Sequence, residues 1–179
     1  IIPHEKRPGD KLLTSYFIHS CDGFVAMSKA VLDELKTFSD TSFKIFLPHP
    51  LYDVFGEKTE KSIALQQLNL SPNNRYVLFF GFIRKYKGLD LLLKAFSDDR
   101  FLHTNIKLLI AGEFYENEKE YIQLINELNI KDRVILYNEY IPSDQVKYFF
   151  CASDIVAQTY ITASQSGVTQ IAYQLERPM

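Results

Sequence analysis

The sequence predicts an α/β fold built on a doubly wound parallel sheet. From Tyr76 onward, short apolar runs with strong β propensity alternate with longer segments whose apolar residues recur at helical spacing. Strands that alternate with helices imply right-handed crossovers, and therefore a parallel sheet with helices on both faces. Of the 179 residues, 46% are hydrophobic and 23% are charged, which is typical of a folded globular protein.

Four strand–helix pairs account for the regular part of the chain. Each apolar run is long enough for a strand and too short for a helix, and Gly81 and Gly112 end the first two runs. The predicted strands are 76–80, 106–111, 134–137 and 154–158. The predicted helices are 88–97, 117–128, 143–150 and 167–175, and Ser143 is expected to cap the third of them.

The segment before Tyr76 is less regular. Residues 1–47 are predicted to form two strands, 23–27 and 44–47, around a helix that Ser28 caps, and this unit is too small to be a domain. A helix or helix end is expected at 12–18. Residues 48–75 are interpreted as a connector that contains one helix and ends in the turn cluster Ser-Pro-Asn-Asn.

Composition excludes several classes of function. The net charge of −2 gives no overall basic field for nucleic acid. The two cysteines are far apart and are expected to be reduced thiols, and the four histidines show no metal-ligand spacing, so we expect no metal site. No transmembrane segment or signal peptide is visible. The chain begins at Ile1 rather than Met, and we expect it to be a fragment of a longer protein.

A basic loop follows the first strand of the regular part. Arg84, Lys85 and Lys87 lie between Gly81 and Gly88, just before a predicted helix. Ligands of open parallel sheets bind beyond the carboxyl ends of the strands, and a helix N-terminus with nearby cations suits a phosphate group. The alternative, equally weighted interpretation is an ordinary solvated loop.

A second candidate loop, 159–167, follows the last predicted strand. It is small, polar and uncharged, and its Ser164, Ser166, Gly167 and Thr169 would bring hydroxyl and N–H groups to a helix N-terminus. In a doubly wound sheet it can share an edge with the basic loop, and the two together would suit a diphosphate. Alternatively, it only caps its own helix.

Four motifs in this order resemble a known family. They are G-x-x-x-x-x-K-G-x-D-x-L-L-x-A-F from Gly81, L-L-I-A-G ending at Gly112, R-V-I-L-Y-N-E-Y-I-P from Arg133, and A-S-D-I-V-A from Ala152. The sequence from about residue 21 to 179 resembles the carboxyl-terminal, donor-binding half of retaining GT-B glycosyltransferases, the family 4-like group also called glycosyl transferases group 1.

The resemblance implies a Rossmann-like donor domain that a linker joins to part of an acceptor domain. Residues 76–179 would be the nucleotide-sugar donor domain, incomplete at its carboxyl end. Residues 1–47 would be a remnant of the amino-terminal acceptor domain, and residues 48–75 the interdomain linker. The resemblance therefore implies that an acceptor domain is largely missing and that this chain alone is inactive.

The resemblance also implies roles for individual residues. Lys87, with Arg84 as a substitute for the family arginine, would stabilise the leaving diphosphate. Further donor-binding residues would be Gly81, Gly88, Gly112, Tyr140, Ile141, Ser164, Gln165, Ser166, Gly167, Val168 and Thr169. The chain departs from the family in having Phe82 where the arginine is usual and Glu139 where a glycine is usual. It also lacks two family glutamates, since no carboxylate lies between Asp154 and Glu176.

The expected function is transfer of a sugar, with retention, from a nucleoside-diphosphate sugar to a glycan or lipid-linked acceptor. No cofactor and no metal are expected, because two cations already face the diphosphate. The resemblance favours a cytoplasmic protein and leaves open a peripheral location at the membrane. Two alternatives remain: a non-catalytic nucleotide-sugar-binding module, which the absent glutamates favour, and a GT-B-fold epimerase or phosphorylase.

Overall fold

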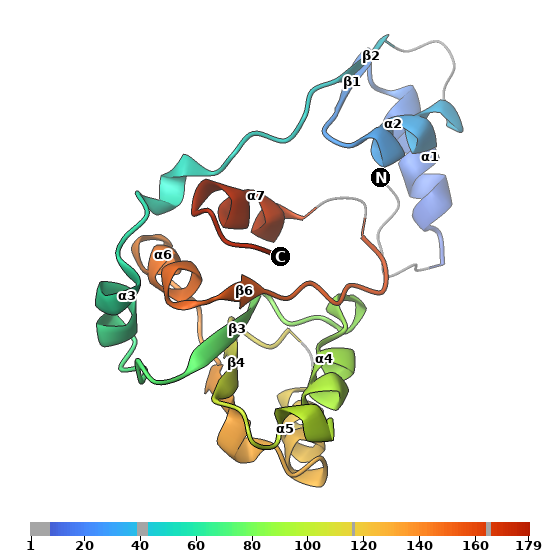
Figure 1. Ribbon diagram of the computed structural model, residues 1–179. Coiled ribbons are helices and arrows are strands. Elements are labelled where there is room, and N and C mark those ends of the chain that lie inside the picture. The colour runs from blue at the N-terminus through green and yellow to red at the C-terminus, as the bar shows by residue number, and fades with distance from the viewer. Residues whose placement is uncertain (1–7, 39–42, 116, 164–165) are drawn as a thin grey trace. The chain divides into compact units, whose positions relative to one another are not determined.

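The computed structural model describes residues 8–38, 43–115, 117–163 and 166–179 (Figure 1). The chain divides into two compact units. One comprises residues 1–50 with 162–166, and the other comprises residues 51–161 with 167–179. The predicted division into acceptor remnant, linker and donor domain stays a prediction, and the two units are described separately below.

The second unit contains a four-stranded, fully parallel sheet. Its strands are β3 (Arg75–Phe80), β4 (Ile106–Ala111), β5 (Val134–Tyr137) and β6 (Ile155–Val156), and they lie in the order β5-β4-β3-β6. Every neighbouring pair is parallel, and the pairing of β3 with β4 extends over all six residues of each strand. The predicted α/β class and parallel sheet are therefore confirmed.

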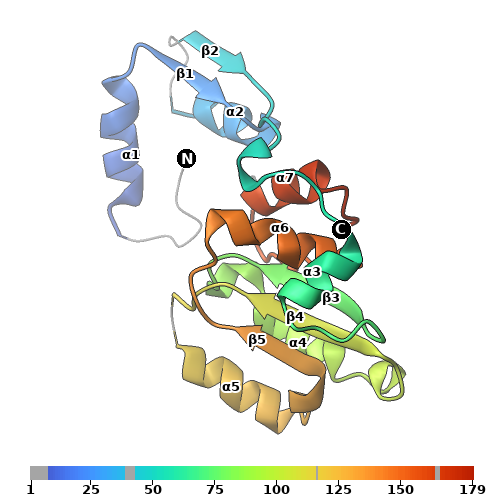
Figure 2. The same ribbon diagram turned by 90° about the vertical axis from the view of Figure 1, so that its left-hand side faces the viewer.

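Helices cover both faces of this sheet (Figure 2). On one face lie α4 (Leu89–Phe96) and α5 (Glu118–Glu127), which share a buried cluster with one set of strand residues. On the other face lie α3 (Lys61–Gln67), α6 (Ser143–Ala152) and α7 (Gly167–Gln174). This arrangement is the doubly wound layout that the sequence predicts.

The side chains of the central strands point alternately to the two faces of the sheet, which explains why both faces are packed. In β3, Leu78 packs into the cluster under α6 and α7, whereas the next residue, Phe79, packs into the cluster under α4. In β4, Leu109 and Ile110 divide between the same two clusters. Successive strand side chains point to opposite faces, so strands buried on both sides must be apolar throughout, as these runs are.

The strand order reverses between β3 and β6, and this places the candidate site. The chain runs outward from β3 through β4 to β5, then returns by α6 to place β6 on the other side of β3. Where the order reverses, the loops after β3 and β6 leave neighbouring strands at the same edge. In open α/β sheets, ligands bind in the crevice at this reversal point.

Several predicted boundaries are corrected by the structure. The last strand, expected at 154–158, has only the two residues Ile155 and Val156 in β6, although the N–H groups of Asp154 and Ala157 also donate to carbonyl oxygens of β3. Pro142, not Ser143, is the N-cap of α6, since its carbonyl accepts the N–H groups of Gln145 and Val146. The other strands and helices predicted from Tyr76 onward are present, and none of their bounds differs from the prediction by more than two residues.

The first unit is built from local sequence in the predicted way. It contains α1 (Asp10–His19), β1 (Gly23–Ala26), α2 (Lys29–Lys36) and β2 (Phe43–Phe46). The two strands pair in parallel around α2, and Ser28 is the N-cap of that helix, its hydroxyl accepting the Val31 N–H at 3.2 Å. Ile18, Ala26 and Leu35 form its small core.

The carboxylate of Asp154 joins three segments of the second unit. Its Oδ2 accepts the buried Tyr76 N–H at 2.8 Å, and its Oδ1 accepts a hydrogen bond from Lys61 Nζ at 2.7 Å. Partial burial raises the pKa of Asp154, but the hydrogen bonds from Lys61 and Tyr76 and the charges of Lys61 and Arg75 outweigh this and lower it. Its contribution to stability is therefore present above the ordinary pKa and is lost as the pH falls through the lowered value.

We expect Asp154→Ala to lower the free energy of unfolding by about 1–2 kcal/mol at pH 7. The substitution leaves the buried Tyr76 N–H, at the start of β3, without a hydrogen-bond acceptor. Asp154→Asn keeps an acceptor for that N–H and should lose only the exposed part of the ion pair, under about 1 kcal/mol. Urea unfolding at pH 7 measures both. Equal losses for Ala and Asn would show that the hydrogen bond to Tyr76 contributes nothing.

Within the residues that the structure describes, no helix is long and apolar enough to span a membrane.

Candidate functional site

The side chain of Lys87 lies at the strand-order reversal point. Lys87 ends the single 3-10 turn η2 (Lys85–Lys87), which precedes α4, and only 8% of its surface is exposed. Its Nζ donates to the Phe80 carbonyl at 3.5 Å. A Cβ on Gly81 would lie 3.1 Å from this Nζ, so the glycine leaves room for the ammonium group against the backbone at the end of β3.

Burial changes the acidity of this ammonium group. Desolvation, with a further contribution from the charge of Arg84, lowers the pKa of Lys87 from 10.5 to about 8. An ammonium group with a long, weak hydrogen bond and a lowered pKa gains most from a nearby anion, because the anion supplies the charge compensation that water no longer gives. The described part of the chain contains one other buried polar side chain, Ser153, and its hydroxyl donates to the Phe149 carbonyl.

Hydrogen bonds join the loop after β6 to the loop after β3. The Thr159 hydroxyl contacts the carbonyl oxygens of Lys87 (3.1 Å) and Gly88 (2.8 Å), and the Ile161 N–H donates to the Tyr86 carbonyl at 2.8 Å. The Tyr160 ring lies 5.9 Å from Lys87 Nζ, within the range of a cation–π contact. The first residues of the second candidate loop therefore fix the turn that carries Lys87.

The first turn of α7 lies on the same side of Gly81. Val168 Cγ2 is 3.8 Å from the Cβ position of Gly81, and Val168 itself is buried in the core. The Thr169 hydroxyl donates to the side-chain oxygen of Gln158 at 3.1 Å. Helix N-termini carry backbone N–H groups without partners inside the helix and a partial positive charge. A helix start and a buried cation therefore face the same point at the end of β3.

A close backbone contact brings the loop after β4 to the same place. Gly112 has a φ of 135°, and a Cβ there would lie 2.5 Å from the Gly81 carbonyl oxygen. Only glycine allows this approach of two backbones. The sequence-predicted residues Gly81, Lys87, Gly88, Gly112 and Val168 are thus neighbours in the structure.

The second predicted cation, Arg84, has an aromatic partner. Its guanidinium carbon lies 4.0 Å from the centroid of the Tyr115 ring, in the loop after β4. The charge of Arg84 contributes to the lowered pKa of Lys87, so the two cations interact electrostatically.

An apolar cavity of about 310 Å³ opens beside Gly81 and Gly112. Its walls come from the carboxyl ends of β3 and β4, the segment after β5, the start of α6, and the 3-10 turn η1 (Asp53–Phe55). Aromatic and aliphatic side chains form most of the lining, which consists of Phe55, Phe80, Gly81, Phe82, Gly112, Glu113, Tyr140, Ile141, Ser143 and Val146. Such a volume and lining fit a flat heterocycle such as a nucleobase.

The remaining predicted site residues divide into those outside the described structure and those that it places. Ser164 and Gln165 lie outside the described residues, and Ser166 belongs to the first unit. Tyr140 and Ile141 do line the apolar cavity, and Ile141 is buried there whereas Tyr140 is exposed.

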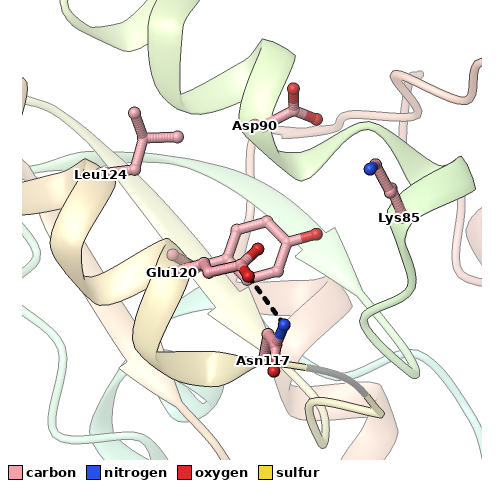
Figure 3. Close-up of a pocket in the computed structure, with 6 residues that line it drawn as sticks. Lys85, Asp90, Asn117, Glu120 and Leu124 are labelled. Atoms are coloured by element: carbon pink, nitrogen blue, oxygen red, sulfur yellow. Dashed lines mark hydrogen bonds between the residues drawn. The ribbon is translucent and has the colours of Figure 1, made fainter.

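A second cavity of about 320 Å³ lies between the starts of α4 and α5 (Figure 3). Lys85 contributes a cation to it, but Asp90 and Glu120 contribute two carboxylates. The Asn117 amide donates to Glu120 at 2.7 Å, as the dashed line in Figure 3 shows. Two carboxylates against one exposed lysine oppose a diphosphate, so electrostatics favour the Lys87 side of the sheet edge.

A family model matches most of the sequence that forms this site. The model for glycosyl transferases group 1 matches residues 60–167, more than half of the chain. The chain belongs to the glycosyl transferases group 1 family. The matched region contains the basic loop, the close contact of Gly81 with Gly112 and most of the apolar cavity.

Individual relatives agree with this membership of glycosyl transferases group 1. A 54-residue stretch is 43% identical to the lipopolysaccharide 1,2-N-acetylglucosaminetransferase of Salmonella typhimurium, covering 30% of this chain and 14% of that protein. The fold is similar to that of Anabaena HepE, crystallised with UDP and glucose. The TM-score is 0.80 and the identity 19%, over 98% of this chain and 48% of that one.

Sucrose-phosphate synthase from Thermosynechococcus elongatus has the same fold. The TM-score is 0.74 and the identity 15%, over 94% of this chain and 43% of that chain. The chain therefore spans less than half the length of each of these relatives of known structure. Together these likenesses support a Rossmann-like half of a GT-B fold for this glycosyl transferases group 1 member.

Sequence reasoning missed two kinds of residue at the site. Phe55 lines the apolar cavity although it lies in the predicted linker, where only its aromatic character was a signal. Tyr115 lies under Arg84, and nothing in the spacing of the two residues predicts that contact. Among the described residues there is no group of three His, Cys, Asp or Glu side chains able to hold a metal ion.

Gly88 is expected to be essential for the contact between the two loops. Its φ is 68°, and a Cβ there would lie 2.2 Å from the Thr159 carbonyl oxygen. Gly88→Ala should lower the free energy of unfolding by about 3 kcal/mol, because left-handed backbone strain adds to displacement of the loop after β6.

Asn129→Ala is the matched control for Gly88→Ala. Asn129 also has a left-handed backbone, with φ 55°, and its side chain is exposed. This control should cost about 1 kcal/mol or less, because it adds strain without displacing a neighbour. If urea unfolding gives Gly88→Ala and Asn129→Ala the same stability, the tight contact at Thr159 does not restrain the loop.

Proposed function

We propose that this chain is the donor-binding part of a retaining glycosyltransferase that uses a nucleoside-diphosphate sugar. In this reaction the bond between the anomeric carbon and the diphosphate oxygen breaks, and a bond to an acceptor oxygen forms on the same face of the sugar. The acceptor is proposed to be a glycan or a lipid-linked sugar, since the 43% identical relative is a lipopolysaccharide sugar transferase by name.

The observation that carries this proposal is the environment of Lys87. A buried ammonium group, with its pKa lowered to about 8, lies at the reversal point of a parallel sheet beside the first turn of α7. Negative charge grows on the leaving diphosphate as the glycosidic bond breaks. A fixed cation in a desolvated position stabilises this growing charge more than water does.

The apolar cavity accounts for the nucleoside part of the donor. It adjoins Gly81, so a base between Phe55, Tyr140 and Ile141 would leave its diphosphate near Lys87. HepE was crystallised with UDP, and we therefore propose uridine as the first base to test. Glu113 lines the same cavity and is our candidate acceptor for a ribose hydroxyl.

The proposed reaction uses no cofactor besides the donor itself. Lys87 and Arg84 would together offset two of the diphosphate charges. We propose that the acceptor site, and any base that acts on the acceptor, belong to an amino-terminal domain whose remnant is residues 1–47. The location of the whole protein, in the cytoplasm or at the membrane surface, is likewise an expectation.

Calorimetric titration of the chain with UDP, GDP and ADP tests donor binding. We expect one nucleoside diphosphate to bind, and we expect the corresponding monophosphate to bind with much lower affinity. Circular dichroism of the same sample shows whether the protein is folded. Equal affinity for monophosphate and diphosphate, in a folded sample, would contradict the assignment of Lys87 and Arg84.

Retention is tested separately on the intact protein that contains this chain. With an α-linked donor sugar and an accepted glycan, the coupling constant of the product anomeric proton should report an α linkage. A β linkage would show an inverting transferase.

A non-catalytic nucleotide-sugar-binding module is the second candidate. The observation that favours it is the absence of any Asp or Glu between Asp154 and Glu176 in the sequence, where the resemblance predicts two glutamates. The two candidates differ in one measurement. A module would bind the nucleoside diphosphate with the same dependence on Lys87, but the intact protein would neither transfer nor hydrolyse the sugar.

A further inference from the structure

The contact between Arg84 and Tyr115 joins two loops at the edge of the sheet. We propose that Tyr115 is a positioning residue, which holds the Arg84 guanidinium in the orientation that receives the donor diphosphate. This inference rests on the proposed function and adds a residue that no motif in the sequence indicates. The guanidinium carbon lies 4.0 Å from the centroid of the ring, and Tyr115 is 59% exposed.

The backbone on both sides of this contact is fixed. The Tyr115 N–H donates to the Ile83 carbonyl at 3.1 Å, and the Ile83 N–H donates to the Glu113 carbonyl at 2.8 Å. Ile83 is fully buried, and Ile83 and Phe114 form an isolated parallel bridge. The Phe114 N–H also donates to the side-chain oxygen of Asn138 at 3.3 Å. The Tyr115 ring is therefore carried on an anchored segment rather than on a free loop tip.

Stacking on a ring leaves the guanidinium able to bind an anion. The ring interacts with the flat face of the guanidinium, whereas all its N–H donors lie in the plane and point outward at the edges. One face is shielded, and the edges remain available for two phosphate oxygens. Tyr115 thus restricts the rotamers of Arg84 without competing for its hydrogen bonds.

The contact also offsets repulsion within the empty site. Arg84 and Lys87 carry like charges, and the charge of Arg84 contributes to lowering the pKa of Lys87. Without an anion, Arg84 gains by moving away into water. The Tyr115 ring gives the guanidinium an attractive partner in the empty site, so less rotamer freedom is lost when the diphosphate arrives.

The position of Arg84 in the loop explains why such a partner is needed. Phe82 occupies the position directly after Gly81, and Arg84 comes two residues later, just before the turn that carries Lys87. Because Arg84 starts farther from the end of β3, its long side chain can take more positions in solvent. The Tyr115 ring, in the loop after β4, favours one of these positions.

Calorimetric titration with UDP and UMP tests this role in four variants. We expect Tyr115→Leu to weaken UDP binding about three- to tenfold and to leave UMP binding unchanged, because only the diphosphate reaches Arg84. Tyr115→Phe keeps the ring and should bind as the unsubstituted protein does. In an Arg84→Met background, Tyr115→Leu should have no further effect.

Tyr140→Leu is the control for a general effect of losing an exposed tyrosine. Tyr140 lines the apolar cavity, so its loss should weaken UDP and UMP by similar factors. The role of Tyr115 is refuted if Tyr115→Leu weakens both nucleotides equally, strengthens UDP binding, or retains its effect when Arg84 is methionine.

An NMR measurement separates this inference from the proposed function. The heteronuclear NOE of the Arg84 Nε–H group reports how ordered that side chain is without any ligand. We expect it to fall on Tyr115→Leu and to be unchanged on Tyr115→Phe. If no nucleotide binds but the NOE falls, the proposed function fails, and only the ordering of the Arg84 side chain by Tyr115 is supported. An unchanged NOE in Tyr115→Leu overturns the positioning whatever the nucleotide result.

Discussion

Replacing Lys87 with methionine should weaken binding of the donor nucleoside diphosphate about 100-fold at pH 7, because the substitution removes the positive charge at the end of β3. The same substitution should raise the free energy of unfolding. Methionine has a similar length, and it removes the desolvation cost of an ammonium group that is 8% exposed. Titration calorimetry and urea unfolding of one preparation give both quantities.

Lys85→Met is the matched control, because Lys85 belongs to the same 3-10 turn and is exposed. It lines the second cavity, beside Asp90, rather than the end of β3. Lys85→Met should therefore change the affinity by less than about threefold. A loss of binding that is similar in both variants would indicate a general electrostatic attraction of the loop and would contradict a specific role for Lys87.

The affinity for the nucleoside diphosphate should fall steeply above pH 8. With its pKa at about 8 in the free protein, Lys87 is mostly charged at pH 7 and mostly neutral at pH 9.5. If only the charged form binds the diphosphate well, the affinity should drop about 30-fold over that interval, and the midpoint should lie near pH 8. Titration calorimetry at half-unit steps measures the curve.

Stability should respond to pH in the opposite direction. The unfolded chain binds the Lys87 proton more tightly than the folded protein does, so the free energy of unfolding without ligand should increase as the pH rises from about 8 toward 10.5. Lys87→Arg is the control, since arginine stays charged throughout. If Lys87→Arg loses affinity between pH 7 and pH 9.5 as the unsubstituted protein does, a different group is titrating.

Periodicity was sufficient to predict the sheet and the helices of the second unit. The strands are buried on both faces, so their apolar runs are continuous and their type is unambiguous, as in β3 and β4. The weakest prediction was the length of β6, which has only two residues and whose Val156 N–H donates to the carbonyl of Pro178, beyond the last helix. Local sequence contains no information about such a distant partner.

The candidate site was only partly predictable for a similar reason. Lys87 could be found because a lysine followed by glycine between a strand and a helix is a local pattern. The contacts of Gly112 with Gly81, of Thr159 with Gly88, and of Tyr115 with Arg84 join different loops. Such contacts depend on strand order, which a single sequence does not specify. The two residues Ser164 and Gln165 remain predictions outside the described structure.

The most direct test of the proposed site is to map the backbone amides of the chain by NMR during titration with UDP. If the donor diphosphate binds at the strand-order reversal, the largest shifts should fall on Gly81, Lys87, Gly112 and Val168, and the Lys87→Met variant should lose them. Shifts concentrated instead around Lys85, Asn117 and Glu120 would place the ligand in the cavity between α4 and α5. That result would contradict the proposed donor site.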